Sequence, residues 1–268
     1  MHHALITGAS SGIGLELARI MAREGHHLIL TARNVLALEE LANELRFKHK
    51  VDIHIIPCDL SEPRSAFTLR KEIKDRNLTI NCLVNNAGFG LLGEFKDLDA
   101  EMQHRMIELN CNSLMALSRL FTDDLIASKG RILNIASVAA FYSGPLMAVY
   151  YATKAFVVSF SEALNFELQK HGVSVTAHCP GPTHSNFQER AGMHNTSLFT
   201  LLPVPDSKTV AEHAYRAMMK RKSLAIHGTV NRMMLFFGAL SPRSLKVRMV
   251  HAFQSSKSYI SDSSAYSR

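Results

Sequence analysis

Three residues in the middle of the chain have side chains and spacing suited to proton transfer. Tyr150 and Lys154 are four positions apart in a segment with a helical pattern, so their side chains can share one helix face. A free phenol has a pKa near 10, and a neighbouring ammonium lowers it by favouring the phenolate. Ser137 directly follows an apolar run, where its hydroxyl could stabilise a developing oxyanion. Tyr and Lys at this spacing are also common on solvated helix faces, so the pair alone is only weak support.

A glycine-rich stretch near the N-terminus, from Thr7 to Gly14, has the features of a dinucleotide-binding turn. It follows a predicted strand and opens a predicted helix, as such a turn requires. Gly8 permits the tight turn, Gly12 lets backbone N–H groups approach a pyrophosphate, and Gly14 lets the helix pack closely on the sheet. The spacing is GxxxGxG instead of GxGxxG, and a purely structural turn is the alternative.

The end of the second predicted strand indicates which nicotinamide cofactor would bind. An enzyme that binds the ribose 2′-hydroxyl commonly has Asp or Glu there, whereas a nearby Arg accommodates a 2′-phosphate. In this chain Ala32 is followed by Arg33. The residue pair therefore favours NADP over NAD, with a solvated strand-end Arg as the alternative.

Short apolar runs alternate with longer amphipathic segments along the first 180 residues. Strands are predicted at 4–7, 27–31, 52–57, 82–85, 131–136 and 174–179, and helices at 12–24, 35–49, 64–76, 101–128 and 148–170. This alternation predicts a doubly wound parallel sheet with helices on both faces. We expect a Rossmann-like, three-layer α/β/α fold in a single domain.

The alternation stops after Pro180. Residues 181–205 are rich in Gly, Pro and small polar residues, which predicts a loop, and 184–205 is the expected substrate lid. A helix over 206–222 and a strand over 223–227 would complete a catalytic domain of residues 1–227. Residues 228–268 are expected to form a helical extension and a tail.

The composition excludes several classes of protein. With 47% hydrophobic and 20% charged residues, the chain of 268 residues is typical of a folded globular protein. The net charge is +7, but the basic residues are spread widely and only 220–222 is a basic run, which argues against a nucleic-acid partner. The cysteines show no metal-ligand or disulfide pattern, so no metal site is predicted. Without a signal peptide or an apolar run of membrane-spanning length, we expect a cytoplasmic protein.

Taken together, the ordered motifs resemble the short-chain dehydrogenase/reductase family over residues 4–227. Thr7 to Gly14 matches its TGxxxGxG turn, Asn85 to Gly88 its NNAG segment, and Tyr150 to Lys154 its YxxxK motif. The resemblance implies Asn110, Ser137, Tyr150 and Lys154 as catalytic residues. It implies that the cofactor is bound by Gly8, Ser10, Ser11, Gly12, Ile13, Gly14, Arg33, Asp59, Leu60, Asn86, Ala87, Gly88, Tyr150, Lys154, Pro180, Gly181, Thr183 and Ser185.

Individual roles follow from the same resemblance. Asp59 would contact adenine, and the backbone carbonyl of Asn110 would hold a water in a proton relay. Pro180 and Gly181 would lie beside the nicotinamide, with Thr183 and Ser185 at its carboxamide. Each position also has a simpler interpretation, because Asp59 could cap a helix, Asn110 could lie on a solvated face, and Pro180-Gly181 could be an ordinary turn. Tyr151 is an alternative to Tyr150, although its distance from Ser137 departs from the thirteen-residue spacing.

The function implied is the interconversion of a carbonyl and a secondary alcohol by hydride transfer with NADPH. Ser137 and Tyr150 would bind the carbonyl oxygen, and Tyr150 would donate the proton. Lys154 would bind the nicotinamide ribose and lower the pKa of Tyr150. One alternative is a 3-oxoacyl-carrier-protein reductase. A different class is a nucleotide-binding regulatory protein that performs no chemistry.

Substrate and partners are less constrained. Apolar residues of the expected lid favour a moderately large apolar carbonyl compound. Pro182 to Phe187, together with the long C-terminal segment, resembles a broad DltE-like branch of oxidoreductases. Residues 233–240 are apolar and 242–251 are basic with interleaved apolar residues, which fits a helix over the cleft or a peripheral membrane or partner contact. A homodimer or homotetramer is expected, since relatives commonly pair the helices that here contain Asn110 and Tyr150.

Overall fold

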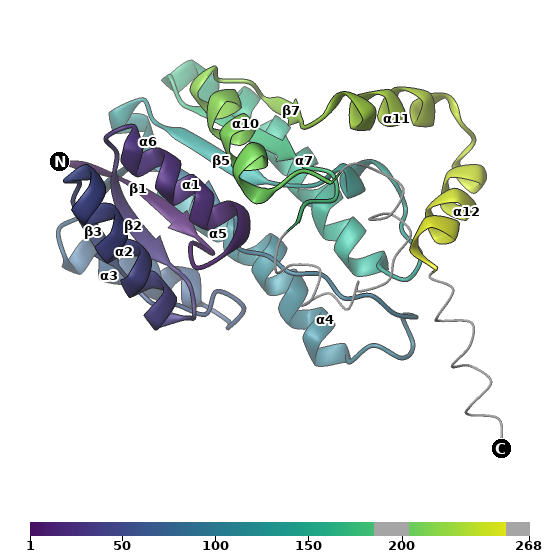
Figure 1. Ribbon diagram of the computed structural model, residues 1–268, viewed down its shortest axis with the longest axis horizontal. Helices are drawn as coiled ribbons and strands as arrows, with labels where there is room; N and C mark the ends of the chain where they lie inside the picture. The colour runs from purple at the N-terminus through teal and green to yellow at the C-terminus, as the bar shows by residue number, and fades with distance from the viewer. Residues whose placement is uncertain (185–203, 256–268) are drawn as a thin grey trace.

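A parallel β-sheet forms the centre of the protein, whose computed structural model describes residues 1–184 and 204–255 (Figure 1). The strands span His2–Thr7 (β1), His27–Thr31 (β2), Ile53–Ile55 (β3), Thr79–Asn85 (β4), Arg131–Ile135 (β5), Ser174–Cys179 (β6) and Leu224–Ile226 (β7). Their order in the sheet is β3-β2-β1-β4-β5-β6-β7, and all neighbouring pairs are parallel. The chain reverses its winding direction between β1 and β4, which is where ligands bind in open α/β sheets.

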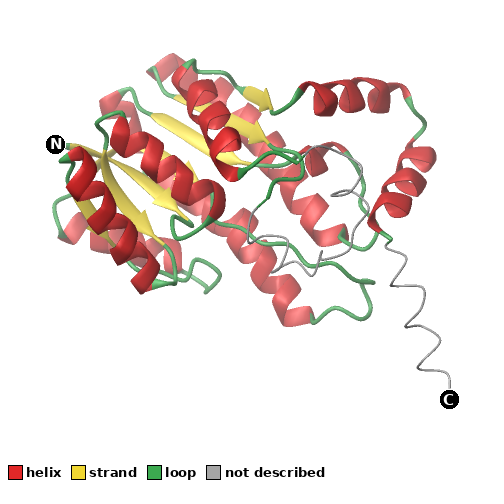
Figure 2. Cartoon of the chain, viewed as in Figure 1, coloured by secondary structure: helices red, strands yellow, loops and turns green. Residues whose placement is uncertain are grey.

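Helices cover both faces of this sheet (Figure 2). Those described are Gly12–Arg23 (α1), Val35–His49 (α2), Ser65–Asp75 (α3), Ala100–Ile107 (α4), Leu114–Leu120 (α5), Thr122–Ser128 (α6), Ala148–Leu168 (α7), Ser207–Met219 (α10), Thr229–Leu240 (α11) and Arg243–Gln254 (α12), with short turns of other helix types at Glu108–Ser113 (η1), Val138–Phe141 (η2) and Gln169–His171 (η3). The predicted single-domain Rossmann-like fold is confirmed.

The core lies in two apolar layers because side chains alternate across each strand. In β1, Ala4 and Ile6 belong to a cluster with residues of α1, α2 and α10. Leu5 belongs to a second cluster on the opposite face, built with residues of α3, α5 and α6. β1 is thus buried on both faces, which fixes the direction in which its end and the following turn point.

One predicted helix is wrong as a continuous element. The segment 101–128 was expected to be a single helix, but it is divided into α4, the π-helical η1, α5 and α6. Asn110 lies in η1, and its side chain accepts a hydrogen bond from Phe89 N at 3.2 Å and donates one to Phe89 O at 2.9 Å. This side chain occupies both backbone groups of Phe89 and thereby joins the helix to the chain after β4.

The end of the domain also differs in detail from the sequence prediction. Asp206 caps α10 by accepting a hydrogen bond from Thr209 N at 2.7 Å, as its residue type indicated. Ser185 and nearly all of the expected lid lie outside the described residues, as do residues 256–268. α11 and α12 lie beyond β7 at one edge of the molecule (Figure 1). None of the described helices is long and apolar enough to cross a membrane.

Candidate active site

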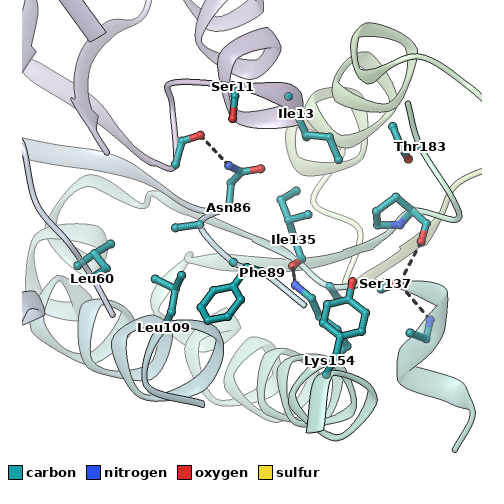
Figure 3. A pocket seen from close by; sticks show the side chains of 18 of the residues that line it. Ser11, Ile13, Leu60, Asn86, Phe89, Leu109, Ile135, Ser137, Lys154 and Thr183 are labelled. Carbon is teal, nitrogen blue, oxygen red and sulfur yellow. Dashed lines mark hydrogen bonds between the residues drawn. The ribbon is translucent and has the colours of Figure 1, made fainter. Parts of the chain in front are cut away.

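A cavity of about 360 Å³ lies at the carboxyl-terminal edge of the sheet (Figure 3). Its walls come from the turn after β1, the segments that follow β2, β3, β4, β5 and β6, and helix α7. The sequence-predicted cofactor and catalytic residues within the described part of the chain line this cavity, apart from Gly14 and Asn110. The fold therefore brings together residues from Gly8 to Thr183 that are far apart in the sequence.

The glycine turn and the segment after β4 are held together by several hydrogen bonds. Asn86 Nδ2 donates to Thr7 O at 2.9 Å and to Gly8 O at 3.2 Å, while Thr7 Oγ1 accepts from Ala87 N at 3.0 Å. A Cβ atom at Gly8 would lie 2.8 Å from Asn86 Nδ2, and one at Gly14 would lie 2.3 Å from Gly8 O. Gly14 thus permits close packing behind the turn and does not line the cavity.

The first turn of α1 could bind an anion through its backbone N–H groups. Ser11 occupies the N-cap position in an extended conformation, and its side chain makes no capping hydrogen bond. Helix N-termini leave backbone N–H groups without intrahelical partners, and these groups and the helix dipole favour phosphate. Because Gly8, Ser10, Ser11, Gly12 and Ile13 all line the cavity, a pyrophosphate fits this part of its wall.

Arg33 lies on the same wall, and its guanidinium faces solvent. Its side chain is 64% exposed, and Nη1 is 3.8 Å from Asp59 Oδ2. Asn34, which also lines the cavity, caps α2 by accepting a hydrogen bond from Ala37 N at 3.1 Å. If the side chain of Arg33 moves to bind a ligand, it therefore loses only its 3.8 Å ion pair with Asp59, and such exposed ion pairs contribute little stability.

Asp59 is a half-buried carboxylate at this end of the cavity. Its Oδ1 accepts hydrogen bonds from Ser61 N at 3.0 Å and Ser61 Oγ at 2.6 Å, and its Oδ2 accepts one from Arg105 Nη2 at 3.1 Å. Burial raises its pKa, but the Ser61 hydrogen bonds and the charges of Arg33 and Arg105 outweigh burial and lower it overall. Asp59 does not cap the following helix, because Arg64 occupies the N-cap of α3.

Ser137, Tyr150 and Lys154 come together at the opposite end of the cavity. Ser137 follows β5 and lies with its Oγ 3.5 Å from Pro180 O, while Ala139 N donates to that Oγ at 3.1 Å. Lys154 Nζ donates to Ile135 O at 2.8 Å and lies 5.8 Å from the centre of the Tyr150 ring. Figure 3 shows Lys154 directed towards the backbone of Ile135, close to Ser137.

The sequence predicted that Lys154 lowers the pKa of Tyr150, but in the structure the pKa of Tyr150 is raised. Burial raises the pKa of Tyr150 to about 12, against a smaller lowering by its hydrogen bond with Ser137. Burial also lowers the pKa of Lys154 to about 8. Lys154 does not lower the pKa of Tyr150 because both groups are desolvated and because the ammonium donates to a carbonyl oxygen of β5. In this state the phenol is firmly protonated, as a proton donor requires.

Asn110 lies behind this group and not on a solvated helix face. It is 2% exposed, and besides its two bonds to Phe89 its Nδ2 donates to Thr153 Oγ1 at 3.1 Å. A Cβ atom at Gly88 would lie 2.9 Å from Asn110 Oδ1 and 3.7 Å from Lys154 Nζ. The Asn110 side chain thus fixes the position of α7 relative to the segment after β4.

Three C-terminal residues also line the cavity. The sequence left open a C-terminal helix over the cleft but named none of these residues. They are Asn231 and Met234 of α11 and Gln254 of α12. Gln254 Nε2 donates to Tyr151 Oη at 2.7 Å, so the second tyrosine is bonded to the C-terminal helix. A Cβ atom at Gly181 would lie 2.4 Å from Asn231 Nδ2. These contacts join segments far apart in the chain, and no local pattern indicates them.

Comparison with known proteins agrees with this geometry. The model of the short chain dehydrogenase family matches residues 2–195, and the chain belongs to that family. It is 28% identical over 263 residues to dehydrogenase/reductase SDR family member 7B of Mus musculus, covering 91% of this chain and 81% of the relative. The protein is thus an oxidoreductase, with relatives that are dehydrogenases and reductases of alcohol and carbonyl groups. This argues against a regulatory protein that performs no chemistry.

Solved structures show the same fold at similar identity. A short-chain dehydrogenase from Sphingobium yanoikuyae in complex with NADPH superposes with a TM-score of 0.79 at 34% identity, covering 90% of this chain and 94% of that one. A bulky-bulky ketone specific alcohol dehydrogenase from Comamonas testosteroni superposes with a TM-score of 0.75 at 31% identity, covering 90% and 92%.

Replacing Lys154 with Met should raise the stability of the protein at neutral pH. The pKa of Lys154 is about 8 in the folded protein against an ordinary 10.5, so the unfolded chain binds more protons between these values. The free energy of unfolding of the wild type therefore rises as the pH rises from about 8 to 10.5. Below pH 8 the full cost of burying the Lys154 ammonium is present. The lowering of the Lys154 pKa corresponds to a destabilisation of roughly 3 kcal/mol, which Lys154→Met removes. The substitution also removes the hydrogen bond to Ile135 O, which costs about 1 kcal/mol.

Urea unfolding of Lys154→Met and wild type at pH 7 and pH 10.5 measures this difference, with Lys170→Met as a control for an exposed lysine. We expect Lys154→Met to be more stable by about 1–3 kcal/mol at pH 7 and to lose this advantage by pH 10.5. A variant that is less stable by the same amount at both pH values would contradict the buried-ammonium penalty.

Proposed function

We propose that the protein is an NADPH-dependent reductase that interconverts a carbonyl compound and a secondary alcohol. One observation supports this most strongly: Ser137, Tyr150 and Lys154 line the same cavity as the glycine turn and Arg33. The NADPH bound in the similar Sphingobium yanoikuyae dehydrogenase supports the choice of cofactor.

The described residues fit such a cofactor from one end of the cavity to the other. Arg33 would bind the 2′-phosphate, Asp59 would contact the adenine, and the first turn of α1 would bind the pyrophosphate. Lys154 would hold the nicotinamide ribose, with Pro180, Gly181 and Thr183 beside the nicotinamide. When bound, the reduced nicotinamide supplies a hydride to the substrate carbonyl carbon.

The protein's own part in the reaction is to bind the carbonyl oxygen and deliver a proton to it. Ser137 Oγ donates a hydrogen bond that stabilises negative charge on that oxygen. Tyr150 Oη transfers its proton to the same oxygen. The Lys154 ammonium then stabilises the phenolate that remains, and the backbone of Asn110 holds a water through which the proton is restored.

Tyr150→Phe should remove most turnover and leave NADPH binding nearly unchanged, because the hydroxyl supplies the proton and little of the cofactor contact. We expect kcat to fall by about 10²–10⁴-fold, the usual contribution of a positioned proton donor. The control is Tyr151→Phe, which removes only the bond to Gln254 and should retain most activity. NADPH oxidation with a panel of ketones and aldehydes measures both. Retained turnover in Tyr150→Phe, with loss in Tyr151→Phe, would mean that the other tyrosine is the donor.

Arg33 should make NADPH bind more tightly than NADH, since a guanidinium forms charge-assisted hydrogen bonds with a phosphate and gains less from a neutral hydroxyl. Arg33→Ala should weaken NADPH by roughly 1.5–3 kcal/mol and barely affect NADH. Arg76→Ala, which removes a half-exposed arginine outside the cavity, controls for the change in net charge. Titration of both cofactors at fixed ionic strength decides the matter. Equal affinities in wild type, or equal losses in Arg33→Ala, would reject this cofactor preference.

The remaining features of the proposal concern substrate and assembly. The cavity wall near Tyr150 includes Met147, Val138 and Met234, which suits a substrate with apolar groups on the carbonyl carbon. A homodimer or homotetramer through the helices that contain Asn110 and Tyr150 agrees with the large exposed side chains of Phe156 and Phe166 on α7. The division at residue 227, the DltE-like branch and a cytoplasmic location stay predictions from the sequence.

A further inference from the structure

The two C-terminal helices expose a large amount of apolar side chain. α11 contains no buried residue, although eight of its twelve residues are Val, Met, Leu, Phe or Ala. Six of its large hydrophobic side chains are 39–76% exposed, and Leu245 and Met249 of α12 are 48% and 49% exposed. The α11 residues concerned are Val230, Met233, Met234, Phe236, Phe237 and Leu240. An apolar helix that no protein covers is normally in contact with another apolar phase.

The same two helices are also basic. Residues 229–254 include four Lys and Arg residues and no Asp or Glu residue. Within α12 the cations are Arg243, Lys246 and Arg248, interleaved with the exposed Leu245 and Met249. No acidic residue of the two helices offsets these positive charges, and those of α12 lie among its exposed apolar side chains.

Both ends of this helix pair are fixed to the body of the protein. At the start of α11, Arg232 Nε donates to Ile226 O at 3.2 Å, and Tyr142 Oη donates to Met234 O at 2.9 Å. At the end of α12, Gln254 donates to Tyr151. The exposed Phe236, Phe237 and Leu240 thus belong to a helix held in place, and Figure 1 shows it at the edge of the molecule.

We propose that α11 and α12 dock the protein on an anionic membrane surface. Phe236, Phe237 and Leu240 would insert among the lipids, and the cations of α12 would contact anionic headgroups. α11 is only about 18 Å long, whereas the hydrocarbon core is about 30 Å thick, so the helix would lie in the interface and not span it.

A membrane accounts for both the apolar side chains and the positive charge of this surface, whereas a second copy of the chain or a nucleic acid does not. In a symmetric dimer the same surface meets itself, so two acid-free segments would face each other and repel. A nucleic acid would attract the cations but would leave the exposed Phe236 and Phe237 without a role. Of these three partners, an anionic surface with an apolar interior is the one that uses both features.

Docking would also place the cavity at the membrane. Asn231, Met234 and Gln254 line the cavity and belong to the same two helices. An apolar carbonyl compound dissolved in the bilayer would then reach the cavity along α11. This last statement rests on the proposed function, whereas membrane docking does not.

Flotation of the full chain with lipid vesicles tests the proposal, because it measures binding without any turnover. We expect partition into vesicles of phosphatidylcholine mixed with phosphatidylglycerol to exceed partition into phosphatidylcholine alone by at least about tenfold, and to fall as salt is raised. Phe236→Ser combined with Phe237→Ser should lower partition by about tenfold or more. The control is Phe47→Ser, which changes a phenylalanine of α2 that is 89% exposed and should bind as wild type.

The contribution of charge is tested in the same assay. Lys246→Glu with Arg248→Glu should lower partition by about tenfold or more, while the exposed pair Lys74→Glu and Lys170→Glu should change it little. Absence of binding to anionic vesicles would overturn the proposal. It would also fail if only the charge variants weakened binding, since that indicates a general polyanion surface. A dimer that Phe236→Ser dissociates, with no vesicle binding, would show that this surface joins two chains.

Discussion

The hydrogen bond from Lys154 Nζ to Ile135 O joins the catalytic helix to the central sheet at the point where β5 ends. Burial lowers the pKa of the Lys154 ammonium to about 8. The hydrogen bond reduces the free-energy cost of this burial, because a buried charge without a partner costs more than a bonded one. Ser137 lies two residues after Ile135, just beyond the end of this strand, and Tyr150 lies one helical turn before Lys154. The positions of all three reacting groups therefore depend on the packing of α7 against β5.

The cofactor end of the cavity depends on a different constraint, which is close packing of backbone. Gly8 and Gly14 meet atoms that would clash with any Cβ, and Asn86 binds the carbonyl oxygens of the same turn. Such close packing restricts which residue types are possible at a few neighbouring positions, so it can be recognised in the sequence. This is why the glycine turn, the succession of strands and helices along the chain up to β6 and many of the cavity residues between Gly8 and Thr183 could be predicted without coordinates.

Other features could not be predicted because they depend on burial and on contacts between distant segments. The pKa of Tyr150 rises and does not fall, since desolvation exceeds the lowering by its hydrogen bond with Ser137, while the Lys154 ammonium is bonded to Ile135 O. The π-helical turn at Asn110 reflects its bonds to Phe89, twenty-one positions earlier. The contact of Gln254 with Tyr151 spans 103 positions. The positive charge of the two C-terminal helices comes less from a run of basic residues than from the absence of Asp and Glu over residues 229–254.

The most direct test of the catalytic centre is the ionisation of Tyr150 itself, followed as the phenolate absorbance of wild type minus that of Tyr150→Phe. In the free protein we expect no phenolate from Tyr150 up to about pH 11, because burial raises its pKa to about 12. With saturating NADP⁺, the positive nicotinamide beside the Lys154 ammonium should bring the midpoint below about pH 10. A midpoint near 10 in the free protein, or no change on adding NADP⁺, would contradict the proposal that burial holds this proton and that cationic charge at the site releases it.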